Sequence, residues 1–271
     1  MTNTRQFIET KEYKRFAEFC DACIKYKYIG ICYGAPGVGK TLSSLKYTNW
    51  DSIGPQLKNK RLSQLEESIT NDIATSTRLF CTAPAEKATT ISTDIRNLGY
   101  KLSYGKALYE AKQNGSELES SAISELRDVE LIIIDEIDRL KLQHLEQLRD
   151  IYDQNNLAMI LIGMPGIEKR LARYPQLYSR IGFSHEFNKL SKGEVHHILE
   201  YKWSELGIPV KLENFSDYEA LTSIIKITGG NFRLIHRLFT QIDRILEINQ
   251  LKSITIEVVE AARDSLVIGF K

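Results

Sequence analysis

The stretch Gly34-Ala-Pro-Gly-Val-Gly-Lys40-Thr41 fits the phosphate-binding loop pattern G-x-x-x-x-G-K-[ST] at every fixed position. The apolar run before it, residues 28–33, is β-prone, and residues 42–47 after it are typical of the first turns of a helix. The glycines let the backbone bend tightly, so that consecutive N–H groups point inward at phosphate oxygens. The pattern therefore predicts a nucleotide site that contains Gly34, Ala35, Pro36, Gly37, Val38, Gly39, Lys40 and Thr41.

Two side chains of this loop have predicted chemical roles. We expect Lys40 to reach the β- and γ-phosphates of ATP, and the Thr41 hydroxyl to bind Mg²⁺. The N-terminus of the following helix adds its partial positive charge to the same site. A plain glycine-rich turn is the alternative interpretation, but such a turn needs neither the strand before it nor the Lys-Thr pair.

A second pattern combines an apolar run with carboxylates. Residues 131–134 are leucine and isoleucine, typical of a strand buried on both faces, and Asp135-Glu136-Ile-Asp138 follows. This is the Walker B arrangement, in which the end of the strand places Asp135 beside the loop to hold Mg²⁺ through water. Glu136 is positioned to polarise the attacking water as a general base. ATP and Mg²⁺ are thus the predicted cofactors, and Thr41 and Asp135 are the residues predicted to hold the Mg²⁺ ion.

Strands and helices alternate along the first part of the chain. The predicted strands are 28–33, 78–82, 131–134, 157–162 and 184–187. We expect a helix marked by Ile91 and Ile95 to stop at Gly99, and a second helix to cover 105–114. The alternation predicts an α/β fold with a parallel, doubly wound sheet and the site at its carboxyl edge.

From Leu190 onward the sequence predicts helices only, over 191–205, 216–227, 231–248 and 255–266. We therefore predict two domains. An α/β nucleotide-binding domain covers residues 1–189 and includes an N-terminal amphipathic helix over 12–26. A small helical lid domain covers residues 190–271.

The composition is that of an ordinary globular protein, with 271 residues, 42% of them hydrophobic and 26% charged. The net charge of +1 creates no global field toward nucleic acid, so that any DNA binding must come from a local patch. The longest apolar runs are too short to span a bilayer, and the first residues lack the apolar region of a signal peptide. We expect a cytoplasmic protein without a membrane partner.

Cys20 and Cys23 form a lone C-x-x-C pair. A zinc site would need a second pair of ligands at a suitable spacing, and a redox site would need a thioredoxin-like context. The favoured interpretation is that both cysteines face the core from one side of a helix. Cys32 and Cys81 fall in predicted core strands.

With these pieces placed, the chain resembles the AAA+ ATPases, and within them the transposition regulators of the TniB/TnsC/MuB group. The resemblance covers nearly the whole chain. Besides the loop and the run Leu131–Leu140, it rests on Leu161-Ile-Gly-Met-Pro165, Leu177-Tyr-Ser-Arg180-Ile and Gly230-Asn-Phe-Arg233-Leu-Ile-His-Arg237. It implies an AAA+ P-loop NTPase fold with a helical lid.

The resemblance also implies catalytic roles for two arginines. Arg180 matches the arginine finger, which reaches the γ-phosphate bound by a neighbouring subunit and makes hydrolysis depend on oligomerisation. Arg233 matches sensor 2, a lid arginine that contacts the phosphates within its own subunit. For each arginine the alternative is a surface salt bridge. The sensor 1 position, which is usually polar, is Met164 here, and this departure predicts slow hydrolysis.

In the family that the chain resembles, ATP-bound subunits form rings or helical filaments around duplex DNA. By position, the phosphate contacts would be Lys87, Thr90, Lys101 and Lys106. Ordinary solvated side chains are the alternative for each of these four residues.

The sequence thus leads to one functional hypothesis and three alternatives. In the hypothesis, an ATPase assembles on double-stranded DNA, recruits or activates a transposase together with target-selection proteins, and disassembles on hydrolysis. The first alternative is a helicase- or clamp-loader-like ATPase that acts on a protein partner. The second is a signalling NTPase without DNA, a class that usually carries fused domains. The third is a non-hydrolysing scaffold, against which Glu136 and Arg180 argue.

Overall fold

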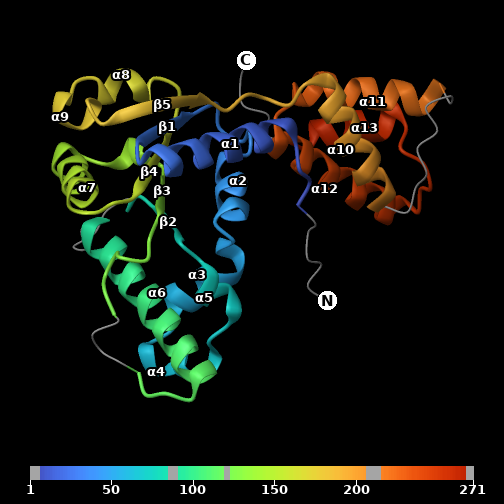
Figure 1. The fold of residues 1–271 in the computed structure, drawn as a ribbon. Helices are drawn as coiled ribbons and strands as arrows, with labels where there is room; N and C mark the ends of the chain where they lie inside the picture. The colour runs from blue at the N-terminus through green and yellow to red at the C-terminus, as the bar shows by residue number, and fades with distance from the viewer. Residues whose placement is uncertain (1–6, 85–90, 119–122, 206–214, 267–271) are drawn as a thin grey trace. The chain divides into compact units, whose positions relative to one another are not determined.

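The computed structural model describes residues 7–84, 91–118, 123–205 and 215–266. The chain divides into two compact units (Figure 1). The first unit contains residues 1–14, 35–39 and 187–271, and the second contains residues 15–34 and 40–186. The predicted domains, 1–189 and 190–271, remain a prediction, because compactness alone shows neither independent folding nor a separate role.

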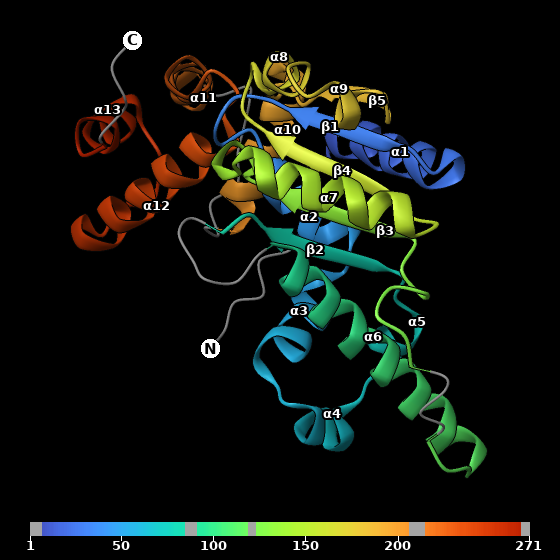
Figure 2. The ribbon, with the colours of Figure 1, turned by 90° about the vertical axis from the view of Figure 1, so that its left-hand side faces the viewer.

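The second unit is built on a five-stranded sheet in the order β2-β3-β4-β1-β5. Its strands are β1 (Ile29–Tyr33), β2 (Arg78–Thr82), β3 (Leu131–Asp135), β4 (Ala158–Gly163) and β5 (Ile181–Glu186). Every neighbouring pair is parallel, as predicted, and Figure 2 shows the strands side by side. Strands β3 and β4 are buried along their whole length, which explains their nearly unbroken apolar sequences.

Helices precede or connect the strands of this sheet. They are α1 (Lys11–Tyr26), which begins in the first unit, α2 (Lys40–Tyr47), α3 (Trp50–Asn59), α4 (Leu62–Ser68), α5 (Asn71–Thr75), α6 (Ile91–Asn114), η2 (Ile137–Arg139), α7 (Leu142–Gln154), α8 (Ile167–Leu171) and α9 (Pro175–Tyr178). Helices α7 and α2 lie on opposite faces of the sheet (Figures 1 and 2).

Helix α1 packs directly on β1. A Cβ atom added to Gly30 would lie 2.6 Å from both Cys23 Sγ and the Phe19 ring, so that only glycine allows this close approach. Cys20 and Cys23 are free thiols buried in this contact, which is the core position that we expected for them. Burial raises the pKa of Cys23 to about 12, so the thiol stays protonated and unreactive.

Two predictions about secondary structure were wrong. Helix α6 continues through Gly99 to Asn114 instead of breaking into two helices. A Cβ atom at Gly99 would lie 1.9 Å from the carbonyl oxygen of Glu125, so this glycine provides room for a neighbouring segment and does not end the helix. Strand β5 covers Ile181–Glu186 rather than 184–187, because its alternating exposure at the sheet edge weakens the apolar signal.

Helices α3, α4 and α5 follow one another between Trp50 and Thr75, in a segment for which the sequence analysis made no prediction. Each helix buries one side through a few apolar residues, Ile53 and Leu57 on α3, Leu65 on α4 and Ile73 on α5. Gly105 of α6 approaches this group closely, because a Cβ atom there would lie 2.7 Å from Ile73 Cγ2. The segment therefore packs along α6 and extends the second unit.

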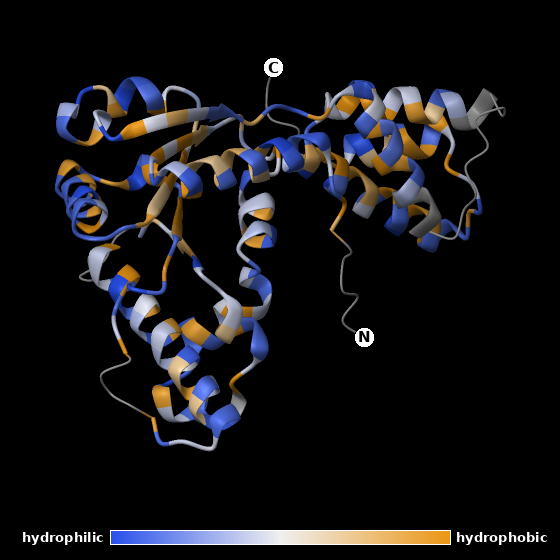
Figure 3. Cartoon of the chain, in the orientation of Figure 1, coloured by the Kyte–Doolittle hydropathy of each residue, from blue (hydrophilic) through white to orange (hydrophobic). Residues whose placement is uncertain are grey.

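The first unit is helical. It contains α10 (Lys192–Glu205), α11 (Phe215–Thr228), α12 (Phe232–Asn249) and α13 (Ile256–Asp264), close to the predicted ranges. Figure 3 shows hydrophobic and hydrophilic residues alternating along these helices, as amphipathic helices require. Their shared core includes Leu199, Ile224, Leu238 and Val259. Within the described ranges, no helix has both the length and the apolar character that crossing a bilayer demands.

Candidate functional site

The phosphate-binding loop joins β1 to α2. Gly37 has a φ of 82° and Gly39 a φ of 117°, and side chains other than hydrogen rarely tolerate this left-handed region. Lys40 begins α2, and its Nζ donates a hydrogen bond to the Gly34 carbonyl at 2.5 Å. The lysine therefore folds back across the base of the loop. In this position it can exchange a carbonyl oxygen for a phosphate oxygen without moving its backbone.

Asp135 and Thr41 are hydrogen-bonded to each other. Asp135 ends β3 and is only 4% exposed. Its Oδ2 accepts a hydrogen bond from Thr41 Oγ1 at 2.6 Å, and its Oδ1 accepts one from the Glu136 backbone N–H at 2.8 Å. Two patterns almost a hundred residues apart thus meet, and the carboxylate is held by both of its oxygens.

These residues fit a magnesium site. Mg²⁺ prefers oxygen ligands, keeps several waters, and is usually held by one or two protein groups together with substrate phosphates. The hydroxyl and the carboxylate supply such oxygens on adjacent elements. Among the residues that the structure describes, no cluster of three or more His, Cys, Asp or Glu side chains forms a metal cage, and a site of this kind does not need one.

Glu136 occupies an unusual backbone position. It has a φ of 60° and a ψ of 37°, which is a left-handed conformation in a residue other than glycine. Such conformations cost about 1–3 kcal/mol and concentrate at functional sites. The Glu136 carboxylate lies 2.5 Å from Arg139 Nη1, and both side chains are 45% exposed. In this structure the proposed general base is therefore paired with an arginine three residues along the chain.

The end of β4 is tied to the Walker B segment through Asp138. Its Oδ2 accepts a hydrogen bond at 2.9 Å from the backbone N–H of Met164, whose side chain is 40% exposed. A Cβ atom at Gly163 would lie 3.0 Å from the same carboxylate oxygen. Asp138 was not among the predicted site residues, although it belongs to the Asp-Glu-x-Asp pattern. The predicted sensor 1 residue thus lies directly after β4 and is hydrogen-bonded to the segment that follows β3.

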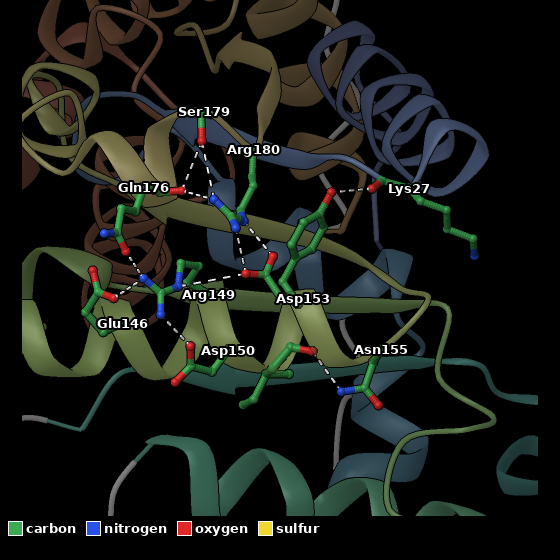
Figure 4. Close-up of polar contacts among 11 residues, drawn as sticks. Lys27, Glu146, Arg149, Asp150, Asp153, Asn155, Gln176, Ser179 and Arg180 are labelled. Carbon is green, nitrogen blue, oxygen red and sulfur yellow. Dashed lines mark hydrogen bonds and ion pairs between the residues drawn. The ribbon is translucent and has the colours of Figure 1, made fainter.

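Arg180 lies between α9 and β5 and is held by α7. Its Nε and Nη2 donate to the two carboxylate oxygens of Asp153 at 2.5 and 2.7 Å (Figure 4). Nη1 donates to the Gln176 carbonyl oxygen. Hydrogen bonding to the Asp153 carboxylate raises the pKa of Arg180. The salt bridge that was the alternative for Arg180 is therefore present, while the role toward a neighbouring subunit stays a prediction.

In the first unit, the loop residues 35–39 pack on the N-terminus of α12. Arg233 is exposed there, and its backbone N–H donates to the Gly37 carbonyl at 3.0 Å. Asn231 caps α12 by accepting from the Leu234 N–H, and its Nδ2 donates to the Pro36 carbonyl at 2.8 Å. The sequence signal for this contact was an asparagine directly before a helix, a common N-cap, which we did not connect to the loop.

The four predicted DNA contacts have different environments. Lys87 and Thr90 lie outside the described residues. Lys101 donates its ammonium to the Leu57 and Lys60 carbonyls at 2.8 and 2.7 Å, and burial lowers the pKa of this lysine. Lys106 is half-exposed on α6. The Lys101 cation therefore satisfies carbonyls at the end of α3, and this structural role competes with a DNA contact.

The sequence of this chain is similar to those of known proteins. An AAA domain model matches residues 23–171, which is more than half of the chain. A Staphylococcus aureus protein described as "Potential ATP-binding protein" is 62% identical over all 271 residues and covers 100% of both chains. The agreement along the entire length of this relative extends beyond the loop and Walker B patterns.

Two solved structures have a similar fold. The Thermotoga maritima RuvB Holliday junction branch migration motor aligns with a TM-score of 0.57 and 18% identity, over 97% of this chain and 71% of that chain. The Aeropyrum pernix ORC2 protein aligns with a TM-score of 0.58 and 15% identity, over 98% and 72%. At such identities the likeness concerns the fold alone, which is the AAA+ P-loop NTPase fold expected from the sequence. By the match over residues 23–171, the chain belongs to the AAA domain family.

Proposed function

We propose that the protein is an ATPase that converts ATP and water to ADP and phosphate. The observation that carries this proposal is the 2.6 Å hydrogen bond between Thr41 and Asp135, because it joins the phosphate-binding loop to the end of β3. Family membership and the full-length relative described as a potential ATP-binding protein support the same conclusion. Mg²⁺, when bound, would neutralise charge that develops on the phosphates.

The residues of the second unit have defined tasks in this mechanism. Lys40 exchanges the Gly34 carbonyl for phosphate oxygens, and Thr41 and Asp135 hold the metal side. Glu136 orients the attacking water and accepts its proton. For this step its carboxylate must leave Arg139, with which it is paired at 2.5 Å. The left-handed backbone of Glu136 fixes the base directly beyond the metal carboxylate.

The remaining charge stabilisation comes from two arginines. Arg233 acts on the phosphates within its own subunit, and Arg180 acts on the nucleotide of a neighbouring subunit, so that hydrolysis requires an oligomer. Met164 at the end of β4 offers a thioether in place of a strong hydrogen-bonding group. We therefore propose slow hydrolysis and a long-lived ATP state.

At a finer level, we propose a transposition regulator of the TniB/TnsC/MuB type. ATP-bound subunits would assemble on double-stranded DNA as a ring or filament and recruit or activate a transposase and target-selection proteins. The motifs around Arg180 and Arg233 support this proposal, as does the fold shared with a branch migration motor. Lys106, with Lys87 and Thr90, is the proposed phosphate contact, whereas the Lys101 ammonium is engaged with carbonyls.

A helicase- or clamp-loader-like ATPase that acts on a protein partner is the second candidate. The fold similarity to RuvB and ORC2 over nearly all of this chain favours it. The two candidates differ in their response to naked duplex DNA. A DNA-assembling regulator coats duplex in the ATP state, whereas the alternative depends on its protein partner.

The ATPase proposal can be tested by measuring phosphate release across a range of protein concentrations, with and without duplex DNA. We expect a low rate of phosphate release per subunit, which rises with protein concentration and rises further when duplex DNA brings subunits together. Glu136→Gln should remove the rate while ATP binding persists in calorimetry. Absence of ATP binding by the wild-type protein would contradict the proposal at its first step.

A further inference from the structure

Arg180 and Asp153 belong to a cluster of alternating charges on α7 and the α9–β5 connection. Arg149 contacts Glu146 Oε2 at 2.5 Å and Asp150 Oδ1 at 2.7 Å, and Arg180 contacts Asp153 (Figure 4). Two arginines thus lie among three carboxylates, which all come from about two turns of α7. All of these residues lie in the second unit.

In this arrangement the guanidinium of Arg180 has almost no donor left for another anion. A guanidinium carries five N–H groups. Four have acceptors here, two on Asp153, one on the Gln176 carbonyl and one on Ser179 Oγ. A phosphate is best bound by two parallel N–H groups. Arg180 can therefore bind a phosphate with two parallel N–H groups only after it gives up at least one of these acceptors, and its Nε–Nη2 edge becomes available only when the paired contact with Asp153 breaks.

Arg149 supplies what Asp153 would need after that break. Its Nε is buried and finds no hydrogen-bond acceptor among the described residues. The same atom lies 3.9 Å from Asp153 Oδ2, which is beyond hydrogen-bonding distance but close enough for an ion pair. A side-chain shift of roughly 1 Å would close this gap to the usual N–H···O distance. The cluster therefore contains an unsatisfied donor directed at the carboxylate that Arg180 now occupies.

We propose that Asp153 is a positioning residue that exchanges partners between two arginines. In the isolated subunit Asp153 holds Arg180 in a paired, retracted state. When a neighbouring subunit presents the triphosphate of its bound ATP, Arg180 moves to that anion and Asp153 moves to Arg149 Nε. The inference deepens the proposed function and rests on the trans role of Arg180 in it.

The exchange has a consequence for assembly. The free energy needed to break the Arg180–Asp153 pair opposes the contact of Arg180 with a neighbouring subunit. The new Arg149–Asp153 hydrogen bond offsets part of this free energy. The side chains of Arg180 and Asp153 are 31% and 36% exposed, so that the opposing term is modest and sensitive to salt. Asp153 would thereby set the subunit concentration at which hydrolysis begins.

A mixing experiment with full-length variants tests both the trans role of Arg180 and the exchange of partners by Asp153. The acceptor is Arg180→Ala, which keeps Glu136 but cannot serve a neighbour. The donor is Glu136→Gln, which keeps Arg180 but cannot hydrolyse ATP. Phosphate release by a fixed amount of acceptor is measured while donor is titrated in. If Arg180 acts in trans, the mixture hydrolyses ATP although each variant alone is inactive.

The exchange of partners is then tested with donors that carry a second substitution, by comparing the donor concentration that gives the half-maximal rate. Asp153→Asn keeps the shape but removes the charge, and should lower the donor concentration at half-maximal rate by about fivefold with the maximum unchanged. Arg149→Met removes the alternative partner of Asp153 and should raise that concentration by a similar factor. Asp150→Asn is the matched control, because it removes a carboxylate that contacts Arg149 and not Arg180, and it should leave the value within about twofold.

The outcomes separate the two claims. No recovery in the mixture of the simple donor and acceptor would overturn the trans role of Arg180, and the exchange with it. Recovery together with an unchanged or higher half-maximal concentration for the Asp153→Asn donor would overturn the exchange and leave the trans role intact. Melting curves identify a variant that fails to fold, and Asp153→Glu, which keeps the charge, should then restore the behaviour of the simple donor.

Discussion

The Thr41–Asp135 pair and the Arg180–Asp153 pair are both built on an aspartate, but they differ in how firmly the surroundings fix them. Asp135 is 4% exposed at the end of a buried strand, and both of its oxygens are held at short distance. Asp153 lies near the end of a surface helix, is 36% exposed, and has two arginines competing for it. The first pair is suited to holding one arrangement, and the second to changing between two.

The largest effect is expected from Glu136→Gln, which should reduce hydrolysis far more than ATP binding. This change removes the proposed base from the fixed region and should slow phosphate release by about 10³-fold. Because the loop, Thr41 and Asp135 remain in place, ATP affinity should change less than about threefold. Parallel calorimetry and phosphate-release assays measure the two quantities. A comparable loss of binding and hydrolysis would show that Glu136 supports the site rather than acting on water.

Lys40→Ala should weaken ATP binding by about 100-fold, because it removes a charge-assisted hydrogen bond to the phosphates. Lys46→Ala is the control, since it lies on the same helix, α2, but at its other end. Calorimetric titration with ATP gives the dissociation constants. If both variants lose affinity equally, general charge rather than the position of Lys40 accounts for nucleotide binding.

Met164→Asn should raise the rate of hydrolysis by roughly tenfold, because an amide can hydrogen-bond the attacking water whereas a thioether does so poorly. The backbone contact of Met164 with Asp138 does not involve its side chain and should persist. Single-turnover measurements on assembled protein isolate this step. Met164→Leu should leave the rate unchanged, and an increase in that variant instead would trace the effect to packing.

The smallest effect concerns Lys101. Lys101→Met removes two hydrogen bonds to carbonyls at the end of α3 and should lower the free energy of unfolding by about 1 kcal/mol. Duplex affinity should change little, whereas Lys106→Gln should weaken duplex binding and leave stability unchanged. Denaturant melts and duplex titrations of both variants distinguish the roles. The reverse pattern would restore Lys101 as a DNA contact.

The firmly held region is also the one that the sequence predicted best. The loop and the carboxylates after β3 are patterns in consecutive residues, and the buried strands show continuous apolar runs. Parallel strands then bring Thr41 and Asp135 to one edge of the sheet, so their proximity follows from topology. The strand order β2-β3-β4-β1-β5 was not predicted from the sequence.

Other features depended on contacts that no local pattern encodes. Gly99 looked like a helix stop, but its lack of a side chain serves the close approach of Glu125. Asn231 was predicted only as part of a helix start, whereas its amide also binds the Pro36 carbonyl. The pairing of Arg180 with Asp153 joins two elements 27 residues apart, and the sequence could only offer a surface salt bridge as an alternative. Residues with several possible partners are the ones that sequence patterns resolve least.

The most direct test of the central claim is the fluorescence anisotropy of labelled duplex DNA with this protein. The titration is made with ATP, a non-hydrolysable ATP analogue, ADP and no nucleotide, each at two salt concentrations. We predict tight, salt-sensitive binding with the two ATP forms only, and weaker binding by Arg180→Ala. Binding that ignores the nucleotide would remove the switch, and no binding under any condition would contradict the assembly of this protein on DNA.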